Sequence, residues 1–342
     1  MVELNGKKIL VTFLMHLGDL TLTTPFIHAL RKAAPDAHIT MLVDEKLKDV
    51  VLFNPYLDEV VTIDKKGRDN SILSLWACSR HLSKLDFDVL INLHPNERCS
   101  FIDAMTSVKL RTGTTHKIFK WFWDVFTPLD RSMHAADMYL DVLQQLGVQD
   151  LSNNGLEIFP GEEHFLEAEL FWQEQNITDQ DKLIGFNIGS AVPTKRWPPE
   201  RFAEVADIFA AKGYKTVFFG GPMDEEMVAE ATGYMQTRPI IATGHFAIGG
   251  LAAAMRRCCL IITNDSGPMH VATSQKVPIV AMYGPSNPKL YGPYTKDAVI
   301  VTAQPPCQGC ADGMKHSCDD LQCMSRMTVE QVVAAAEKML EK

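Results

Sequence analysis

The sequence predicts an α/β protein made of two open parallel-sheet domains in tandem, and three observations lead to this prediction. Apolar runs typical of buried strands alternate with single stretches of helical periodicity, which indicates parallel strands joined by crossover helices. This alternation occurs in both halves of the chain. The chain also has 342 residues, more than the roughly 250–300 that one hydrophobic core supports.

The order of the expected elements follows from the apolar pattern. In the first half, strands are expected at 7–15, 37–44 and 87–94, and helices at 23–35 and 71–85. In the second half, strands are expected at 182–189, 214–221, 239–244, 259–265 and 278–284, and helices at 198–213, 223–235, 247–258 and 267–277. The polar segment 147–163 is the expected junction, and the domains are expected to cover residues 1–155 and 156–342.

Composition indicates an ordinary globular protein. Apolar residues make up 46% of the chain and charged residues 22%, and the formal net charge is −9, which argues against nucleic-acid binding. No apolar run approaches the roughly 20 residues that a transmembrane helix needs. The first residues also lack the pattern of a signal peptide. We therefore expect a cytoplasmic protein.

Polar segments follow five of the expected strands at the same end. They cover residues 16–25, 92–98, 187–198, 218–226 and 263–270. In open parallel sheets, ligands bind beyond the carboxyl ends of the strands. Each of these segments is therefore a candidate part of a functional site, and the site is expected where the two domains face each other.

The segment 263–274, TNDSGPMHVATS, reads as a strand end, a tight turn and the start of a helix. Such a helix start offers free N–H groups and a favourable dipole to an anion. The turn at Ser266 and Gly267 is expected to bind a pyrophosphate together with the Ser190 hydroxyl and the Lys195 ammonium.

Two further residues of the second half have alternative interpretations. His270 is either a polar residue at a helix start or a donor to a diphosphate oxygen. Glu225 either stabilises a helix start through the dipole or binds a pair of ribose hydroxyls.

The turn after the first strand contains a single glycine, Gly18, so a dinucleotide cofactor in the first domain is not expected. Asp19 lies in this turn, after the strand and before the helix. It is either a helix N-cap, a common role for aspartate there, or a general base for an incoming hydroxyl.

Two segments of the first half are basic. One carries Lys65, Lys66 and Arg68. The other, residues 109–126, combines four cations with five aromatic residues: Lys109, Arg111, Lys117, Lys120, Phe119, Trp121, Phe122, Trp123 and Phe126. The second segment is either a core helix with a solvated basic edge or a surface for an anionic, lipid-attached acceptor at a membrane.

Four of the eight cysteines are clustered near the end of the chain: Cys307, Cys310, Cys318 and Cys323. They could hold a structural zinc ion or remain free or oxidisable thiols. Nothing in the sequence indicates a catalytic metal. The other four cysteines lie in apolar patterns, where buried free thiols are expected.

Three segments are distinctive: 16–43, HLGDLTLTTPFIHALRKAAPDAHITMLV, then 189–209, GSAVPTKRWPPERFAEVADIF, and 263–288, TNDSGPMHVATSQKVPIVAMYGPSNP. In these segments, and nearly from end to end, the sequence resembles the bacterial heptosyltransferases of glycosyltransferase family 9. The motifs are more similar to those of heptosyltransferases II and III than to those of I. The resemblance implies the GT-B fold, with an acceptor-binding domain at 1–155 and a nucleotide-sugar-binding domain at 156–342.

The resemblance also implies roles for individual residues. Asp19 matches the family's base, and Lys195 matches its donor-binding lysine. Asp265 matches the residue that contacts the heptose, and Ser266, Gly267 and His270 match the diphosphate-binding turn. Ser190 stands where the family often has a phosphate-binding hydroxyl, but Ala191 replaces a second one. Acceptor contacts are expected from Lys65, Lys66, Arg68 and Arg111.

The implied activity is inverting transfer of heptose from ADP-L-glycero-D-manno-heptose to the inner core of lipopolysaccharide. The donor is a co-substrate, no cofactor or divalent ion is required, and the acceptor is an anionic lipid-linked oligosaccharide at the cytoplasmic face of the inner membrane. One alternative is a GT-B hexosyltransferase or epimerase with another nucleotide sugar. Another is an inactive homologue that binds a nucleotide sugar or a lipid.

Overall fold

The computed structural model describes residues 2–303 and 321–341. Residue contacts divide the chain into two compact units, Met1–Phe159 (unit 1) and Pro160–Lys342 (unit 2). The division falls four residues after the expected boundary, inside the polar segment 147–163. No helix in the described part of the chain is long and apolar enough to cross a bilayer.

Unit 1 contains a parallel sheet of six strands in the order β3-β2-β1-β4-β5-β6. The strands are β1 (Lys8–Thr12), β2 (His38–Asp44), β3 (Glu59–Ile63), β4 (Phe87–Asn92), β5 (Val108–Gly113) and β6 (Val125–Phe126). The central strand β1 pairs in parallel with both neighbours, so that Val11 lies opposite Met41 on one side and Ile91 on the other. Because helices cover both faces, β1 is buried from Ile9 to Thr12.

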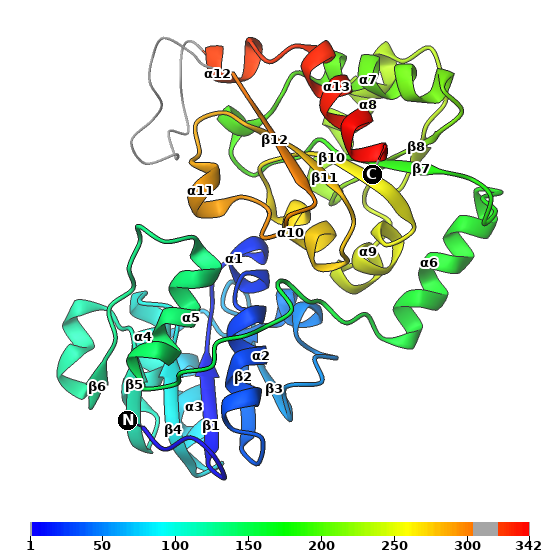
Figure 1. The fold of residues 1–342 in the computed structure, drawn as a ribbon. Helices are drawn as coiled ribbons and strands as arrows, with labels where there is room; N and C mark the ends of the chain where they lie inside the picture. Colours follow the sequence, from blue (N-terminus) through cyan, green and yellow to red (C-terminus); the bar gives the residue numbers. More distant parts are fainter. Residues whose placement is uncertain (1, 304–320, 342) are drawn as a thin grey trace. The chain divides into compact units, whose positions relative to one another are not determined.

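The main helices of unit 1 form a layer on each face of the sheet (Figure 1). They are α1 (Leu17–Thr21), α2 (Thr24–Ala33), α3 (Ile72–Ser83), α4 (Glu97–Met105) and α5 (Ala135–Gln145), with the 3₁₀ segments η1 (Glu45–Val50) and η2 (Lys117–Phe122). Helices α2 and α5 cover one face, and α3 and α4 cover the other. On the second face, Leu10 and Leu90 pack with Leu82 and Ile102 in one buried cluster.

Unit 2 repeats the design with the strand order β12-β11-β10-β7-β8-β9, again fully parallel. The strands are β7 (Leu183–Asn187), β8 (Lys215–Phe219), β9 (Ile240–Ile241), β10 (Cys258–Asn264), β11 (Ile279–Tyr283) and β12 (Ala298–Thr302). Every residue of β7 and β11 is buried. Strands β7 and β10 are neighbours, so the loops that follow them start side by side.

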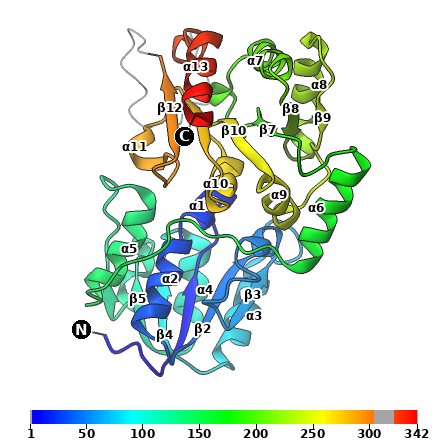
Figure 2. The same ribbon diagram turned by 45° about the vertical axis from the view of Figure 1, so that its right-hand side comes forward.

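The helices of unit 2 also lie on both faces of the sheet (Figure 2). They are α6 (Glu162–Glu174), α7 (Pro199–Ala211), α8 (Glu225–Tyr234), α9 (Ile248–Met255), α10 (Gly267–Ser274), α11 (Pro288–Tyr291), α12 (Gln322–Ser325) and α13 (Val329–Leu340), with η3 (Pro193–Lys195) and η4 (Pro222–Asp224). Helices α7, α8 and α13 cover one face, and α6, α9 and α10 the other. Phe186, Phe218 and Trp197 form the centre of the core beneath α7 and α13.

The two tandem parallel sheets confirm the fold class predicted from the sequence. The pattern did not indicate β3, β5 or β12, which lie toward the sheet edges and are only partly buried. The interpretation of 109–126 as a core helix is wrong. Its centre is the 3₁₀ segment η2, which contains no buried residue.

Candidate functional site

In unit 2, the loops after β7 and β10 are locked together by side-chain amides. The Asn187 amide donates to Ser266 Oγ at 2.8 Å and to Thr263 Oγ1 at 3.0 Å. Asn264 donates to the Ile188 carbonyl at 2.7 Å and accepts from Trp197 N at 3.1 Å. These bonds satisfy buried polar groups and fix the spacing of the two loops. The edge that carries Ser190, Lys195 and Ser266 is therefore built in advance of any ligand.

A buried ion pair lies at the centre of this edge. Lys195 Nζ is 2.8 Å from Asp265 Oδ2, and the two side chains are 17% and 7% exposed. The hydroxyl of Ser286, from the loop after β11, donates to the same carboxylate oxygen. Ser190 Oγ donates to the Asp265 backbone carbonyl at 3.3 Å. The structure thus brings Lys195, Asp265 and Ser190 together, and it adds Ser286, which the sequence did not single out.

The start of α10 lies beside this pair. Ser266 is the N-cap, with an extended backbone at φ −157°, and its hydroxyl makes no capping bond to the helix. Gly267 is the first helical residue and Pro268 follows it, so little bulk covers the helix start. His270 lies in the first turn and is buried. The positive end of the helix dipole favours an anion at this position.

Tyr283 supports the pair from the end of β11. Burial, reinforced by the charge of Asp265, raises the pKa of the Tyr283 phenol, so the phenol stays neutral. Its hydroxyl donates to the Tyr291 carbonyl at 2.7 Å. Tyr283 therefore ties the loop after β11, which carries Ser286, to the end of the sheet.

Two carboxylates after β8, those of Asp224 and Glu225, each lie close to a glycine that follows a neighbouring strand. Glu225 is the first residue of α8, where its charge complements the helix dipole. Gly244 has φ +74°, and a Cβ there would come within 2.6 Å of Glu225 Oε1. A side chain at Gly189 would likewise meet the carboxylate of Asp224. Small residues at these positions leave room for both carboxylates at the edge of the sheet.

In unit 1, Asp19 is the third residue of α1 and lies at the carboxyl edge of the sheet. The N-cap of α1 is His16, so the interpretation of Asp19 as an N-cap is wrong. The side chain of Asp19 is 26% exposed, and its Oδ2 lies 3.7 Å from His16 Nδ1. A carboxylate that reaches solvent from a helix start can accept a proton from a ligand.

Lys65 holds the turn that leads to Asp19. Its ammonium donates to the carbonyls of Leu14 at 2.7 Å and Met15 at 2.9 Å, and it pairs with Asp44 Oδ2 at 3.1 Å. The side chain is only 12% exposed. In this structure the three donors of Lys65 are directed to the protein itself, and its expected contact with the acceptor stays a prediction.

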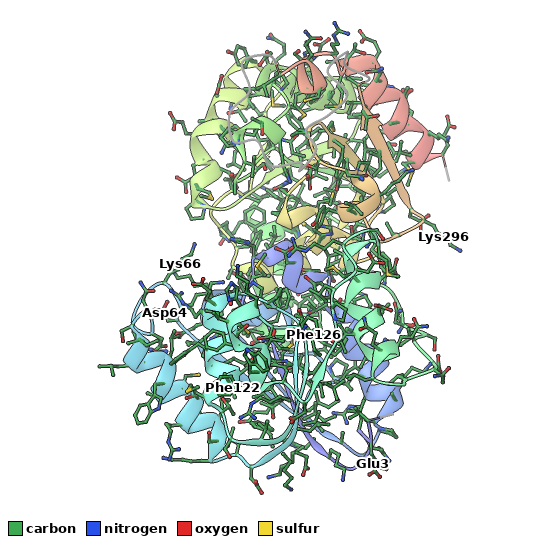
Figure 3. All side chains as sticks on the ribbon, turned by 90° about the vertical axis from the view of Figure 1, so that its left-hand side faces the viewer. Glu3, Asp64, Lys66, Phe122, Phe126 and Lys296 are labelled. Atoms are coloured by element: carbon green, nitrogen blue, oxygen red, sulfur yellow. The ribbon has the colours of Figure 1, made fainter. Side chains whose placement is uncertain are left out.

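The other expected acceptor cations divide into two groups. Lys66 is exposed and Figure 3 shows it at the periphery of unit 1. Arg68 is 68% exposed and pairs with Glu45 at 2.9 Å and Asp69 at 3.2 Å, contacts that are weak in water. Arg111 instead donates to the carbonyls of Asp103 and Thr106 at the end of α4. Arg111 thus caps a helix in this structure, and its expected role as an acceptor ligand stays a prediction.

An open surface pocket of about 470 Å³ lies at the start of α4. It is lined by Asn96, Glu97, Arg98 and His116. Arg98 donates to the Lys65 carbonyl, and it donates to Asn70 Oδ1 at 2.7 Å. The pocket therefore adjoins the loop that carries Lys66 and Arg68. The sequence indicated the segment 92–98 but none of these residues individually.

His94 lies in the loop between β4 and α4 and is buried. Burial, together with the charge of Lys65, lowers the pKa of His94 to about 4. The imidazole is therefore neutral at physiological pH. Its ring lies 5.6 Å from that of Phe13, beside the turn that leads to Asp19.

The cysteine cluster falls largely outside the described residues. Cys307, Cys310 and Cys318 belong to the segment 304–320, and only Cys323 is described. Within residues 2–303 and 321–341, no group of three or more His, Cys, Asp or Glu side chains is arranged to hold a metal ion. Of the cysteines in apolar patterns, Cys99 and Cys258 are buried free thiols, as expected, and Cys78 and Cys259 are partly buried free thiols.

Two parallel α/β units, each with polar loops at the carboxyl edge of its sheet, are the architecture of the GT-B heptosyltransferase structures. The chain belongs to glycosyltransferase family 9 (heptosyltransferase), whose family profile matches residues 75–318. It is 25% identical to lipopolysaccharide heptosyltransferase 3 of Escherichia coli K12, over 94% of this chain and 95% of the relative. It is therefore an enzyme of the heptosyltransferase family.

Solved structures agree with this assignment. A glycosyl transferase of family 9 from Veillonella parvula is 52% identical, with a TM-score of 0.93 over 99% of both chains. The Escherichia coli heptosyltransferase WaaC, solved with ADP-2-deoxy-2-fluoro heptose, is 16% identical, with a TM-score of 0.72 over 97% of this chain and 99% of that one. At this identity, the second similarity supports the fold alone.

Proposed function

We propose that this protein transfers heptose from ADP-L-glycero-D-manno-heptose to the inner core of lipopolysaccharide with inversion at the anomeric carbon. The observation that carries the proposal is the edge of unit 2, where the Lys195–Asp265 pair lies beside the start of α10. A lysine and a helix start suit a nucleotide diphosphate. The membership of the chain in the heptosyltransferase family supports the choice of sugar.

In the proposed complex, the diphosphate lies at Ser266 and Gly267, with Ser190 as a further hydroxyl donor. Lys195 shares its ammonium between Asp265 and a phosphate oxygen. Asp265 keeps one carboxylate oxygen for a heptose hydroxyl, since Ser286 and Lys195 both contact Oδ2. Glu225 accepts hydrogen bonds from the ribose hydroxyls, and His270 donates a hydrogen bond to a diphosphate oxygen.

In the proposed reaction, Asp19 removes the proton from an acceptor hydroxyl as its oxygen attacks the anomeric carbon. The new glycosidic bond forms on one face of the sugar while the bond to ADP breaks on the other. The electron pair of that bond leaves with the diphosphate, where Lys195 and the start of α10 offset the charge. One fixed donor at such a site contributes on the order of 3 kcal/mol to transition-state stabilisation.

The acceptor is proposed to be an anionic oligosaccharide linked to lipid. Its proposed cationic partners are Lys66, Arg68 and Arg98, and Arg98 lies beside the open pocket at Asn96 and His116. Because this acceptor is anchored in a bilayer, the enzyme is proposed to work at the surface of the inner membrane.

The test is to incubate purified protein with ADP-heptose and a truncated core oligosaccharide and to measure the product mass. The expected result is a gain of one heptose and release of ADP, both lost in Asp19→Ala. A product that carries a different sugar from a mixture of ADP-, UDP- and GDP-sugars would contradict the proposed donor. Release of ADP without a glycosylated product would contradict the proposed acceptor.

A further inference from the structure

The segment η2 exposes aromatic and aliphatic side chains to an unusual degree. Trp121 is 95% exposed, Ile118 60% and Phe122 46%. Phe126, four residues after Phe122, is 36% exposed, and both phenylalanines lie on the side of unit 1 that Figure 3 turns toward the viewer. Clustered apolar exposure of this kind marks an interaction surface, since single scattered residues are the norm on monomers.

The fold holds this segment in place from both sides. Trp123 is buried, and its indole donates to the Thr112 carbonyl at 3.0 Å. Phe119 packs edge-to-face on Phe101 of α4, with ring centroids 6.2 Å apart. Asp124 N donates to the Arg111 carbonyl at 3.0 Å. The exposed side chains therefore project from an anchored segment whose two ends are fixed to the sheet and to α4.

The sequence of η2 and of the residues before it is basic within an acidic protein, and two exposed carboxylates flank it: Glu97, whose Oε1 lies 3.8 Å from His116 Nε2, and Asp124. Residues 104–123 contain four Lys or Arg and no Asp or Glu, whereas the whole chain carries −9. Lys109 pairs with Asp88, and Arg111 caps α4. Lys117 and Lys120 remain exposed on η2, and Lys120 Nζ lies 4.4 Å from the centre of the Phe126 ring.

We propose that η2 docks on an anionic lipid bilayer, with Ile118, Trp121 and Phe122 in the interfacial region and with Lys117 and Lys120 on headgroup phosphates. Tryptophan is favoured at that depth because its ring is apolar and its N–H is polar, and neighbouring lysines add attraction to anionic lipid. This inference rests on the proposed lipid-linked acceptor. His116 of the open pocket immediately precedes η2, so docking would hold that pocket next to the membrane.

Another exposed apolar surface of the chain provides a matched comparison. Helix α6 exposes Leu166 at 57% and Leu170 at 50%. These leucines stand among five glutamates: Glu162, Glu163, Glu167, Glu169 and Glu174. An anionic bilayer repels such a surface, so exposure of apolar side chains alone does not predict docking there.

The test is co-sedimentation of the full chain with phosphatidylcholine vesicles that contain or lack phosphatidylglycerol. We expect binding only to the anionic vesicles. Lys117→Gln with Lys120→Gln should weaken it about thirty-fold, from about 1 kcal/mol for each cation. Trp121→Ala with Phe122→Ala should weaken binding at least as much, whereas Leu166→Ala with Leu170→Ala should leave it unchanged.

Activity on a lipid-free core oligosaccharide separates this inference from the proposed function. The Trp121→Ala, Phe122→Ala variant should keep that activity while losing vesicle binding. Equal binding by this variant and the unchanged protein would overturn the docking surface. Light scattering gives a second outcome that would overturn it. If the unchanged protein is an oligomer and the variant is a monomer, the surface binds a second copy of the chain and not a bilayer.

Discussion

Lys195 Nζ lies 2.8 Å from Asp265 Oδ2, and both side chains are largely removed from water. In the absence of ligand, the carboxylate, held also by Ser286, keeps the ammonium at the edge of the sheet. The lysine is therefore already oriented for the proposed diphosphate, which would reduce the entropy lost on binding.

Replacing Lys195 by methionine should weaken ADP binding by about ten- to a hundred-fold, the range for a hydrogen bond to a charged group. It should also lower the thermal midpoint, because Asp265 would stay buried without its cation. Isothermal titration with ADP and thermal unfolding measure the two effects. Lys289→Met, an exposed lysine on α11, is the control and should change neither. An unchanged ADP affinity in Lys195→Met would contradict the donor site.

Asp19→Asn should lower kcat by about a hundred- to ten-thousand-fold, the contribution expected of a general base. The affinity for ADP should not change, because the proposed donor site lies in unit 2. Steady-state ADP release and titration with ADP measure the two quantities. A variant that keeps most of its turnover would show that another group takes the proton.

The neighbours Lys65 and Lys66 should behave in opposite ways. Lys65→Met removes the donor to the Leu14 and Met15 carbonyls and leaves the buried Asp44 without its cation, so both stability and kcat should fall. Lys66→Met should leave stability unchanged and raise KM for the anionic acceptor, since its side chain is exposed. Urea unfolding and acceptor kinetics distinguish the two. If Lys65→Met changed only the acceptor KM, the positioning role would be disproved.

The fold was predictable because its signals are local. Strand β10 and helix α10 follow directly from the apolar run Leu260–Ile262 and the turn that contains Gly267 and Pro268. The rule that ligands lie at the carboxyl ends of strands brought Ser190 and Asp265 together correctly, because β7 and β10 are neighbours. Ser286 was missed, although its segment GPSNP is also a polar turn after a strand and could have been included.

Roles that depend on distant contacts could not be predicted. The direction of the Lys65 side chain is set by carbonyls about fifty residues earlier, and that of Arg111 by the end of α4. The aromatic composition of 109–126 allowed either a core helix or an exposed surface, and within residues 117–123 only Trp123 is buried. The burial of Asp103 was not predicted, because an aspartate in a helical pattern is normally exposed to solvent.

Asp103 should make stability depend on pH in an unusual direction. The side chain is fully buried on α4, where its Oδ2 accepts from Thr12 Oγ1 at 2.8 Å and from the Asn92 amide at 2.5 Å. Burial raises its pKa to about 8, although the hydrogen bonds oppose this shift. Between its unfolded pKa near 3.8 and about 8, only the folded state holds the proton.

The stability contributed by the Asp103 proton is therefore fully present below pH 4 and falls as pH rises to about 8, by up to about 1.4 kcal/mol per unit. Above pH 8 the contribution is constant, because both states have lost the proton. Asp103→Asn has nearly the same shape and can still accept from Thr12 and Asn92, so this decline should be absent in the variant. Urea unfolding from pH 5 to 9 measures the difference in slope between the two proteins. Parallel curves would show that Asp103 is ionised in the folded protein, and its contacts with Thr12 and Asn92 would then be bonds to a buried carboxylate.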